Sequence, residues 1–278
     1  NPVKPNGPNL PDPAACVAAS KRIVGGELVK DKSLVALSTG ALKLTTSQGS
    51  GTCTATLIGP RQMVTAAHCL QREYISIEAK FGLDNNSAEI VIPVEKWVAH
   101  PLWKTQEPPY DIGLVTLKTP VPNHLIAVQI ANVQDLVLGT DIIIAGYGTP
   151  SENAQETLPL SMVAVPLESV NSADRYFSTV INGTGGCYGD SGGPGYLLDK
   201  RTSCLKLAGV VSISSVKGNG ICGQGDTMMD VTRYTGWIGS SLEQLGAPLP
   251  GLAMDGSEVA ATQNQVKTAW SGELPARN

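Results

Sequence analysis

The chain has 278 residues, of which 42% are hydrophobic and 16% are charged, and its formal net charge is -4. This length is enough for one all-β domain of about 200–250 residues with extensions, or for two smaller domains. The slightly acidic balance offers no basic stripe for nucleic acid, and no apolar run reaches the ~18 residues of a membrane span.

The chain starts at Asn1, without a Met or an apolar leader segment, so we expect a secreted protein, extracellular or periplasmic, from which a signal peptide has been removed. Its six cysteines include no Cys-x-x-Cys pair, which favours disulfides over zinc and indicates an oxidising compartment. We find no loop of spaced acidic residues for calcium. We expect a monomer with neither a metal nor any other cofactor.

The first 20 residues contain five prolines and no repeating apolar face, which indicates an extended arm. A basic pair, Lys21-Arg22, follows this arm and precedes the tetrapeptide Ile23-Val24-Gly25-Gly26. Taken alone, such a pair is most often solvated charge.

After residue 26, short β-branched stretches separated by Gly, Pro, Asn and Asp predict strands, clearly so at 74–79, 89–92, 142–145 and 205–213. One helix is predicted before the tail, Tyr234 to Leu245, which follows Thr232 and ends at Gly246. Many short strands and one late helix favour antiparallel barrels or a sandwich. Beyond Gly246, residues 247–251 are typical of a linker, and residues 254–270 predict a weak helix.

A serine lies among glycines in the run Cys187-Tyr188-Gly189-Asp190-Ser191-Gly192-Gly193-Pro194. Acyl transfer by a serine hydroxyl needs backbone donors aimed at the developing oxyanion, and each donor contributes about 10²–10³ in rate. Glycines allow the tight turn that crowds amides around one point. The alternative is a glycine-rich surface loop, but with Gly at about 7% and Pro at about 5% of average sequence, the hexapeptide Gly189–Pro194 arises by chance in about 10⁻⁵ of chains.

A nucleophilic serine needs a base, usually a histidine, and a third group that holds the base. His68 follows an apolar run and stands next to a cysteine, where a rigid element would fix its ring, whereas His100 and His124 are typical of loops or strand ends. For any single histidine a structural role is the more frequent one. Asp111 opens the apolar stretch 112–117, and a carboxylate there is expected to be partly buried and to have a partner.

Three motifs together resemble the chymotrypsin/trypsin family of serine proteases: Thr65-Ala66-Ala67-His68-Cys69, Asp111-Ile112-Gly113-Leu114 and Gly189-Asp190-Ser191-Gly192-Gly193-Pro194. Their order, His then Asp then Ser, is that of the family, and the resemblance runs from Ile23 to about Leu245. It implies an all-β fold of two antiparallel six-stranded β-barrels with the site in the cleft between them. The implied division of the chain is a propeptide arm (1–22), a protease domain (23–246, with barrels over about 23–130 and 131–233 and a C-terminal helix over about 234–246) and a C-terminal extension (247–278).

In this resemblance Ser191 is the nucleophile, His68 is the general base and then the general acid, and Asp111 orients the imidazole and stabilises its charged form. The amides of Gly189 and Ser191 would form the oxyanion hole. The implied activity is hydrolysis of peptide bonds by a secreted serine endopeptidase. The implied partners are protein or peptide substrates, an activating protease and protease inhibitors.

The resemblance also gives Arg22 and Ile23 a role, because family members are made as inactive precursors that are cut just before an Ile-Val-Gly-Gly sequence. The new α-amine would turn inward and pair with Asp190, which raises the pKa of the amine above its usual value of about 8. Residues 1–22 belong to the chain, which is consistent with an uncut precursor whose oxyanion hole is not yet built.

The resemblance implies two disulfides, one beside the histidine and one bracing the specificity pocket: Cys53–Cys69 and Cys187–Cys222. In many relatives the position of Cys204 is bridged to a cysteine at the position that Ile142 occupies here. Cys204 therefore lacks its usual partner. The remaining cysteine, Cys16, would bridge to it and keep the cut arm attached.

The resemblance places Gly185 at the floor of the specificity pocket, where trypsin-like relatives carry a carboxylate that selects Lys or Arg, so the floor is uncharged here. Counting back from Val231-Thr232 puts Asp226 on the pocket wall, whereas counting forward from Cys222 puts Met228 there. A solvated turn residue is an equally open interpretation of Asp226. With Asp226 in the wall, we predict cleavage after Arg or Lys with loose selectivity.

The chain departs from the family close to where substrate would bind. Thr54-Ala55 replaces the glycine pair common after the first bridge cysteine, and Ser212-Ile213-Ser214 replaces a Ser-Trp-Gly segment. Tyr188, Ser212 and Ser214 are our further candidates for substrate binding.

Two other function classes compete with a protease. A catalytically inactive, protease-like binding protein is a known fate of this fold, but all three triad positions are filled here. An esterase of the α/β-hydrolase type needs its acid and histidine after the serine, and all three histidines precede Ser191.

Overall fold

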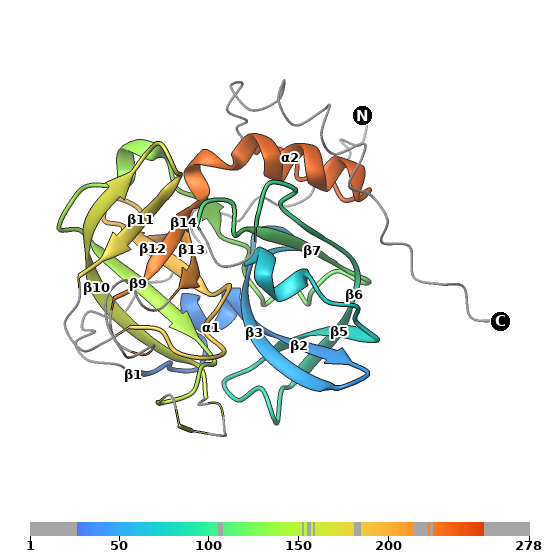
Figure 1. The fold of residues 1–278 in the computed structure, drawn as a ribbon. Coiled ribbons are helices and arrows are strands. Elements are labelled where there is room, and N and C mark those ends of the chain that lie inside the picture. The colour runs from blue at the N-terminus through green and yellow to red at the C-terminus, as the bar shows by residue number, and fades with distance from the viewer. Residues whose placement is uncertain are drawn as a thin grey trace, which may run out of the picture.

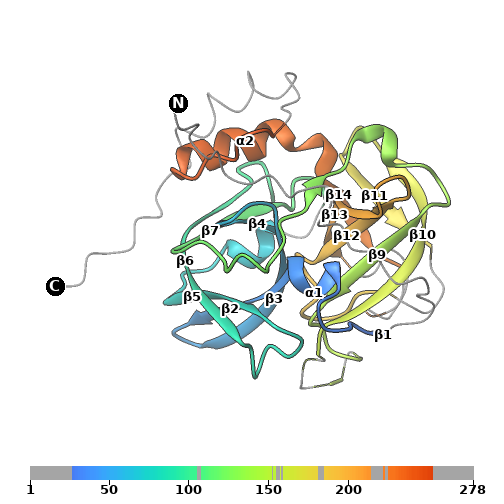
Figure 2. The same ribbon diagram turned by 180° about the vertical axis from the view of Figure 1, so that it is seen from behind.

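The computed structural model describes residues 27–104, 108–151, 153–154, 157, 159–180, 185–213, 222 and 225–252. Within these residues two β-barrels lie side by side, as Figures 1 and 2 show from opposite sides. Both barrels are closed and antiparallel, and each has six strands. The predicted fold class is therefore confirmed.

The first barrel closes in the order β2-β3-β4-β7-β6-β5, with β5 pairing back to β2. The strands β4 and β7 are buried along their whole length, whereas β5 alternates between buried and more exposed residues, as a strand with one solvated face does. The strands are β2 (Thr39–Thr46), β3 (Gly49–Leu57), β4 (Gln62–Thr65), β5 (Ser76–Phe81), β6 (Ile90–Ala99) and β7 (Gly113–Leu117).

The second barrel runs β10-β11-β14-β13-β12-β9 and closes where β9 pairs with β10. Two short strands extend it: β1 (Glu27–Leu28) adds to β10, and β8 (Gln129–Ile130) runs parallel to β13. Its own strands are β9 (Asp141–Gly146), β10 (Ser161–Asn171), β11 (Tyr176–Thr179), β12 (Pro194–Asp199), β13 (Cys204–Ile213) and β14 (Thr227–Asp230). The four predicted strand segments fall on β5, β6, β9 and β13.

Helices are few in the described part of the chain. The helix predicted over 234–245 is α2 (Thr235–Gln244), and a short α1 (Leu34–Ser38) precedes β2. The 3₁₀-helices are η2 (Ala67–Leu70), η3 (Val133–Asp135) and η4 (Val231–Arg233). None of the described helices has the length and apolar character to cross a membrane. The weak helix predicted over 254–270 lies outside the described residues.

The helix α2 follows the second barrel in the chain but packs over the first, above β7 (Figure 1). Trp237 is completely buried, and its ring lies 4.7 Å from the ring of His100, which follows β6. The His100 ring also stacks on Tyr110 and accepts a hydrogen bond at Nδ1 from the amide of Leu102. Burial, assisted by the charge of Arg175, lowers the pKa of His100 to about 3. His100 is therefore a neutral core residue that joins the helix to the first barrel.

The stretch 247–251, which its composition predicted to be a linker, is docked on the first barrel. Gln62 donates hydrogen bonds from Nε2 to the carbonyl oxygens of Ala247 (3.1 Å) and Pro248 (3.4 Å). Leu249 packs against the main hydrophobic core. The linker prediction was wrong because the composition of Pro and Gly says nothing about a partner such as Gln62, which is far away in the sequence.

The contact between α2 and the first barrel gives a test of stability. We expect Trp237→Ala to lower the free energy of unfolding by about 3–5 kcal/mol, because the change leaves a cavity beside His100. Chemical denaturation measures this value. Leu138→Ala is the matched control, since Leu138 is 63% exposed and its truncation should change stability by less than about 0.5 kcal/mol. Equal effects of the two changes would contradict this account of the helix.

Candidate active site

Strand pairing in the first barrel brings His68 and Asp111 together. In the register of β4 and β7, Thr65 at the end of β4 lies opposite Gly113 at the start of β7. His68 lies three residues beyond Thr65, in η2, and Asp111 lies two residues before Gly113. Because the two strands are antiparallel, the segments beyond these ends lie on the same edge of the barrel.

The Asp111 carboxylate holds His68 at two points. Its Oδ1 accepts from the His68 backbone N–H (2.8 Å), and its Oδ2 lies 2.7 Å from His68 Nδ1. Ser212 on β13 donates from Oγ to the same Oδ2 (2.6 Å). Asp111 is only 3% exposed, so its charge is stabilised by these donors rather than by water. Because Nδ1 faces a carboxylate, the tautomer that donates from Nδ1 satisfies this contact and directs the lone pair of Nε2 away from Asp111.

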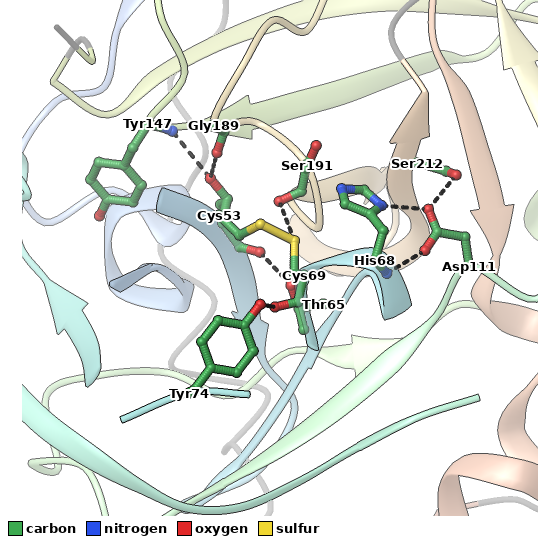
Figure 3. Close-up of a disulfide and its surroundings, with 11 residues drawn as sticks. Cys53, Thr65, His68, Cys69, Tyr74, Asp111, Tyr147, Gly189, Ser191 and Ser212 are labelled. Atoms are coloured by element: carbon green, nitrogen blue, oxygen red, sulfur yellow. Dashed lines mark hydrogen bonds and ion pairs between the residues drawn. A yellow bond between two sulfur atoms is a disulfide. The ribbon is translucent and has the colours of Figure 1, made fainter. Parts of the chain in front are cut away.

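Ser191 lies on the other side of the His68 ring from Asp111 (Figure 3). It precedes β12, so it comes from the second barrel, whereas His68 and Asp111 come from the first. In the described structure no hydrogen bond joins the Ser191 hydroxyl to the ring, which is common for catalytic groups before substrate binds. The three residues that the sequence motifs singled out thus meet where the two barrels face each other.

The loop that carries Ser191 is held tightly by its neighbours. The Ser191 carbonyl oxygen accepts from the amide of Thr54 (2.8 Å), and the Gly192 amide donates to the carbonyl oxygen of Val211 (2.8 Å). Gly192 has φ +80°, and a Cβ atom there would collide with the Thr65 hydroxyl and the Thr54 carbonyl. Only glycine fits at this position, because the first barrel approaches the loop so closely.

The amides of Gly189 and Ser191 make no hydrogen bond within the described residues. Gly189 has φ +98°, and its carbonyl oxygen instead accepts from the Thr54 hydroxyl (2.8 Å). The carbonyl groups of Gly189 and Ser191 are thus both hydrogen-bonded, while the amides of the same two residues remain available. Two unpaired donors next to a serine hydroxyl are the arrangement that stabilises an oxyanion.

Two disulfides brace the site, Cys53–Cys69 and Cys187–Cys222. Cys69 directly follows His68, and Cys187 begins the run that carries Ser191. Cys204 is also disulfide-bonded, but the predicted partner Cys16 lies outside the described residues. Cys53, His68 and Cys69 form the one grouping of metal-ligating residue types in the described part of the chain. It does not suit a metal, because both sulfur atoms belong to the disulfide.

Asp190 is enclosed by backbone donors. Its Oδ1 accepts from the amide of Gly148 and its Oδ2 from the amide of Cys187, both at 2.8 Å. Burial, joined by the nearby charge of Asp226, raises the pKa of Asp190 to about 7 against the lowering effect of the two amides. No cation pairs with Asp190 among the described residues. The predicted activation residues Arg22 and Ile23 lie outside them.

Asp226 is completely buried, and both of its carboxylate oxygens lie within 3.1 Å of the Gly186 amide, which donates to them. Its own amide donates to Thr179 Oγ1 (3.0 Å). The solvated turn residue that we considered is therefore excluded. Met228, the alternative wall residue, is wrong as well, because it is buried in the core of the second barrel against Phe177 and other apolar residues.

The other predicted pocket residues differ in how well the structure supports a place near the substrate. Gly185 lies next to Gly186 and thus close to Asp226, and Tyr188 is 48% exposed beside the nucleophile loop. The Ser212 hydroxyl is bound to Asp111, so only the backbone of Ser212 remains for substrate. Ser214 lies outside the described residues. Sequence reasoning missed the role of Ser212 in holding Asp111 and the hydrogen bonds of Thr54. Both residues lie in segments that the sequence analysis had marked as different from the family, Thr54-Ala55 and Ser212-Ile213-Ser214.

Several known proteins are similar to this chain in sequence. Human chymotrypsin-like elastase family member 1 is 27% identical over 207 residues, which are 67% of this chain and 80% of the relative. Mouse kallikrein-8 is 29% identical over 213 residues, 69% of this chain and 77% of the relative. A trypsin of the bacterium Saccharopolyspora erythraea is 27% identical over 189 residues, 62% of this chain and 80% of the relative.

Among solved structures, HL collagenase aligns with a TM-score of 0.66 at 21% identity, covering 82% of this chain and 100% of that chain. This likeness shows the shared two-barrel fold. The family model described as Trypsin matches residues 23–238, more than half of the chain. The chain therefore belongs to the trypsin family of serine proteases.

Proposed function

We propose that the protein is a secreted endopeptidase that cleaves peptide bonds with Ser191 as nucleophile, His68 as base and Asp111 as the residue that orients the base. The observation that carries this proposal is the hydrogen-bonded series Ser212–Asp111–His68, with Ser191 on the far side of the ring. An inactive binding protein would not need a buried carboxylate that orients a partly exposed imidazole.

In the proposed reaction, His68 Nε2 takes the proton of the Ser191 hydroxyl as Oγ attacks the scissile carbonyl carbon. The carbonyl oxygen becomes an oxyanion and accepts from the free amides of Gly189 and Ser191. The Asp111 carboxylate stabilises the imidazolium, which then gives its proton to the leaving amine. The C–N bond breaks and an acyl-enzyme remains. Water, deprotonated by the same nitrogen, hydrolyses this ester and restores the serine.

Activation is proposed to follow cleavage between Arg22 and Ile23. Asp190 supports this idea, because its carboxylate is held by two amides but lacks a cationic partner among the described residues. A new α-amine at Ile23 would supply that positive charge and would lower the pKa of Asp190 from its raised value. Asp190 adjoins Ser191, so such a pair would stabilise the nucleophile loop.

For specificity, we propose that Asp226 gives the pocket a negative potential that favours Arg or Lys before the scissile bond. Its carboxylate is covered and bound to the Gly186 amide, so it would act on the substrate through the Gly185-Gly186 backbone. A charge that acts without direct contact discriminates weakly. We therefore propose loose selectivity, with some cleavage after large apolar residues. Protein substrates, an activating protease and protein inhibitors are the corresponding partners.

We predict that Ser191→Ala or His68→Ala lowers kcat by about 10⁶ without loss of the fold, because the three residues act as a unit. Hydrolysis of a chromogenic peptide by the activated protein measures kcat, and thermal melting checks the fold. His124→Ala is the control, because His124 is exposed and should be neutral. Activity of either active-site variant within tenfold of the parent protein would refute the assignment.

We predict that limited trypsin treatment cuts after Arg22 and switches activity on. N-terminal sequencing would then find Ile23, and with a Cys16–Cys204 bridge the arm would leave only on reduction. Full activity in protein that still begins at Asn1 would show that this scheme is wrong.

The raised pKa of Asp190 adds a pH signature to the uncut protein. Because the folded state binds the Asp190 proton more tightly than the unfolded state does, its contribution to stability is present at low pH and is lost as pH rises from about 4 to about 7. Asp190→Asn should remove this loss in the uncut protein, yet should abolish activity after cutting. Melting curves from pH 4 to 8, before and after cleavage, measure both effects.

Asp226→Asn should lower kcat/KM for substrates with Arg or Lys before the scissile bond by about tenfold, since the amide keeps an acceptor for Gly186 but loses the charge, and one tenfold step corresponds to about 1.4 kcal/mol. Profiling with a peptide library measures the change against apolar substrates. Asp141→Asn removes a charge from the exposed start of β9 and should leave the profile as it was. An unchanged profile in Asp226→Asn would mean that other residues determine specificity.

A further inference from the structure

Thr54 lies on β3 at the point where the first barrel meets the nucleophile loop. It is completely buried and directly follows Cys53 of the bridge beside His68. On β2 its partner is Ala41, but β3 pairs with β4 only at Thr56 and Leu57. The backbone of Thr54 is therefore unpaired on the side toward β4, where residues outside the β3–β4 ladder bind it.

Every polar group of Thr54 is engaged there. Its amide donates to the Ser191 carbonyl oxygen (2.8 Å), and its carbonyl oxygen accepts from the Thr65 hydroxyl (2.8 Å). Its hydroxyl donates to the Gly189 carbonyl oxygen (2.8 Å) and accepts from the Tyr147 amide (3.2 Å). The last two bonds are the dashed lines that leave Gly189 and Tyr147 in Figure 3.

Two glycines of the second barrel lie close to this side chain, although both are confined first by other groups, chiefly Asp190 and the Ala145 carbonyl oxygen. A Cβ atom at Gly146 would lie 3.1 Å from Thr54 Oγ1, and one at Gly193 would lie 3.4 Å from Thr54 Cβ. The hydroxyl therefore occupies a confined space between the loop that carries Ser191 and the end of β9. Its two hydrogen bonds join these segments of the second barrel to β3 of the first.

Gly189 is the residue that most needs such a restraint. With φ +98° and no side chain, it rotates more freely than any other residue type would. Its amide is one of the two proposed oxyanion donors, and rotation about Gly189 would change the relation of that donor to Ser191. Thr54 holds the carbonyl groups of both donor residues, one with its hydroxyl and one with its amide.

We propose that Thr54 is a positioning residue whose hydroxyl fixes Gly189 so that the Gly189 and Ser191 amides point at a common oxyanion site. This inference rests on the proposed peptidase function. The Ser191 restraint comes from a backbone amide and survives any substitution except proline, whereas the Gly189 restraint depends on the threonine hydroxyl.

The test uses the full chain, activated by immobilised trypsin that is then removed. Thr54→Val keeps the shape of the side chain and removes the hydroxyl, whereas Thr54→Ser keeps the hydroxyl. Thr52→Val is the control: it also replaces a threonine by valine, two residues earlier on β3, where the side chain has no hydrogen bond among the described residues. Each variant is assayed for kcat and KM with a peptide amide. Each is also assayed for binding of a peptide aldehyde and of the matching peptide alcohol.

Removal of one oxyanion donor lowers kcat by about 10²–10³, so a misplaced donor should lower it by about 10–100-fold. We expect this loss in Thr54→Val with KM within threefold. Affinity for the aldehyde, which forms a tetrahedral adduct, should fall by a similar factor, while affinity for the alcohol should change less than twofold. Thr54→Ser and Thr52→Val should stay within threefold of the parent in every assay.

The inference is overturned when Thr54→Val keeps kcat within threefold, or when aldehyde and alcohol affinities fall together, which would indicate a general distortion. If Thr54→Val does not fold, Thr54→Ala replaces it and is compared with Thr54→Ser on the same criteria. Labelling of Ser191 by a sulfonyl fluoride in the parent protein distinguishes a failure of the proposed peptidase function from a failure of the proposed role of Thr54. A parent that is neither labelled nor active refutes the proposed function and this inference with it, whereas an active parent with a normal Thr54→Val variant refutes this inference alone.

Discussion

The site depends on the burial of one carboxylate, Asp111, between two barrels. A charge that is removed from water must be met by donors that are already in place, and Asp111 receives them from both sides. His68 supplies its amide and its ring from the first barrel, and Ser212 supplies a hydroxyl from the second. The same bonds that stabilise the charge therefore set the orientation of the imidazole and connect the barrels.

The loop that carries Ser191 is subject to a steric constraint, because its backbone must pass close to the first barrel. Gly192 has no room for a side chain next to Thr65 and Thr54. The close approach allows β3 to bind the carbonyl groups of Gly189 and Ser191, which leaves their amides free. The hydrogen bonds of Thr54 thus join the two barrels at the place where the chemistry is proposed to occur.

Two carboxylates, those of Asp190 and Asp226, lie behind this loop. Asp190 and Asp226 are close enough that the charge of Asp226 adds to the raised pKa of Asp190. Backbone amides bind both carboxylates, those of Cys187 and Gly148 for Asp190 and that of Gly186 for Asp226. A positive charge placed near Asp190 would lower its pKa again, which is the change that the proposed activation would bring about.

The local patterns of the sequence indicated an all-β chain, as barrels or a sandwich, and singled out Ser191, His68 and Asp111 as candidates. The resemblance of three motifs, in their order, to the trypsin family then pointed to two six-stranded barrels. The sequence also determined the position of α2 to within a residue. Only the tertiary structure showed that Asp226 is completely buried against the Gly186 amide and that Met228 lies in the core of the second barrel, since a count of residues cannot tell which way a side chain points. It likewise revealed the docking of 247–251 on Gln62 and the contacts of Thr54 and Ser212, because each of these joins residues that the chain keeps far apart and that only barrel packing brings together.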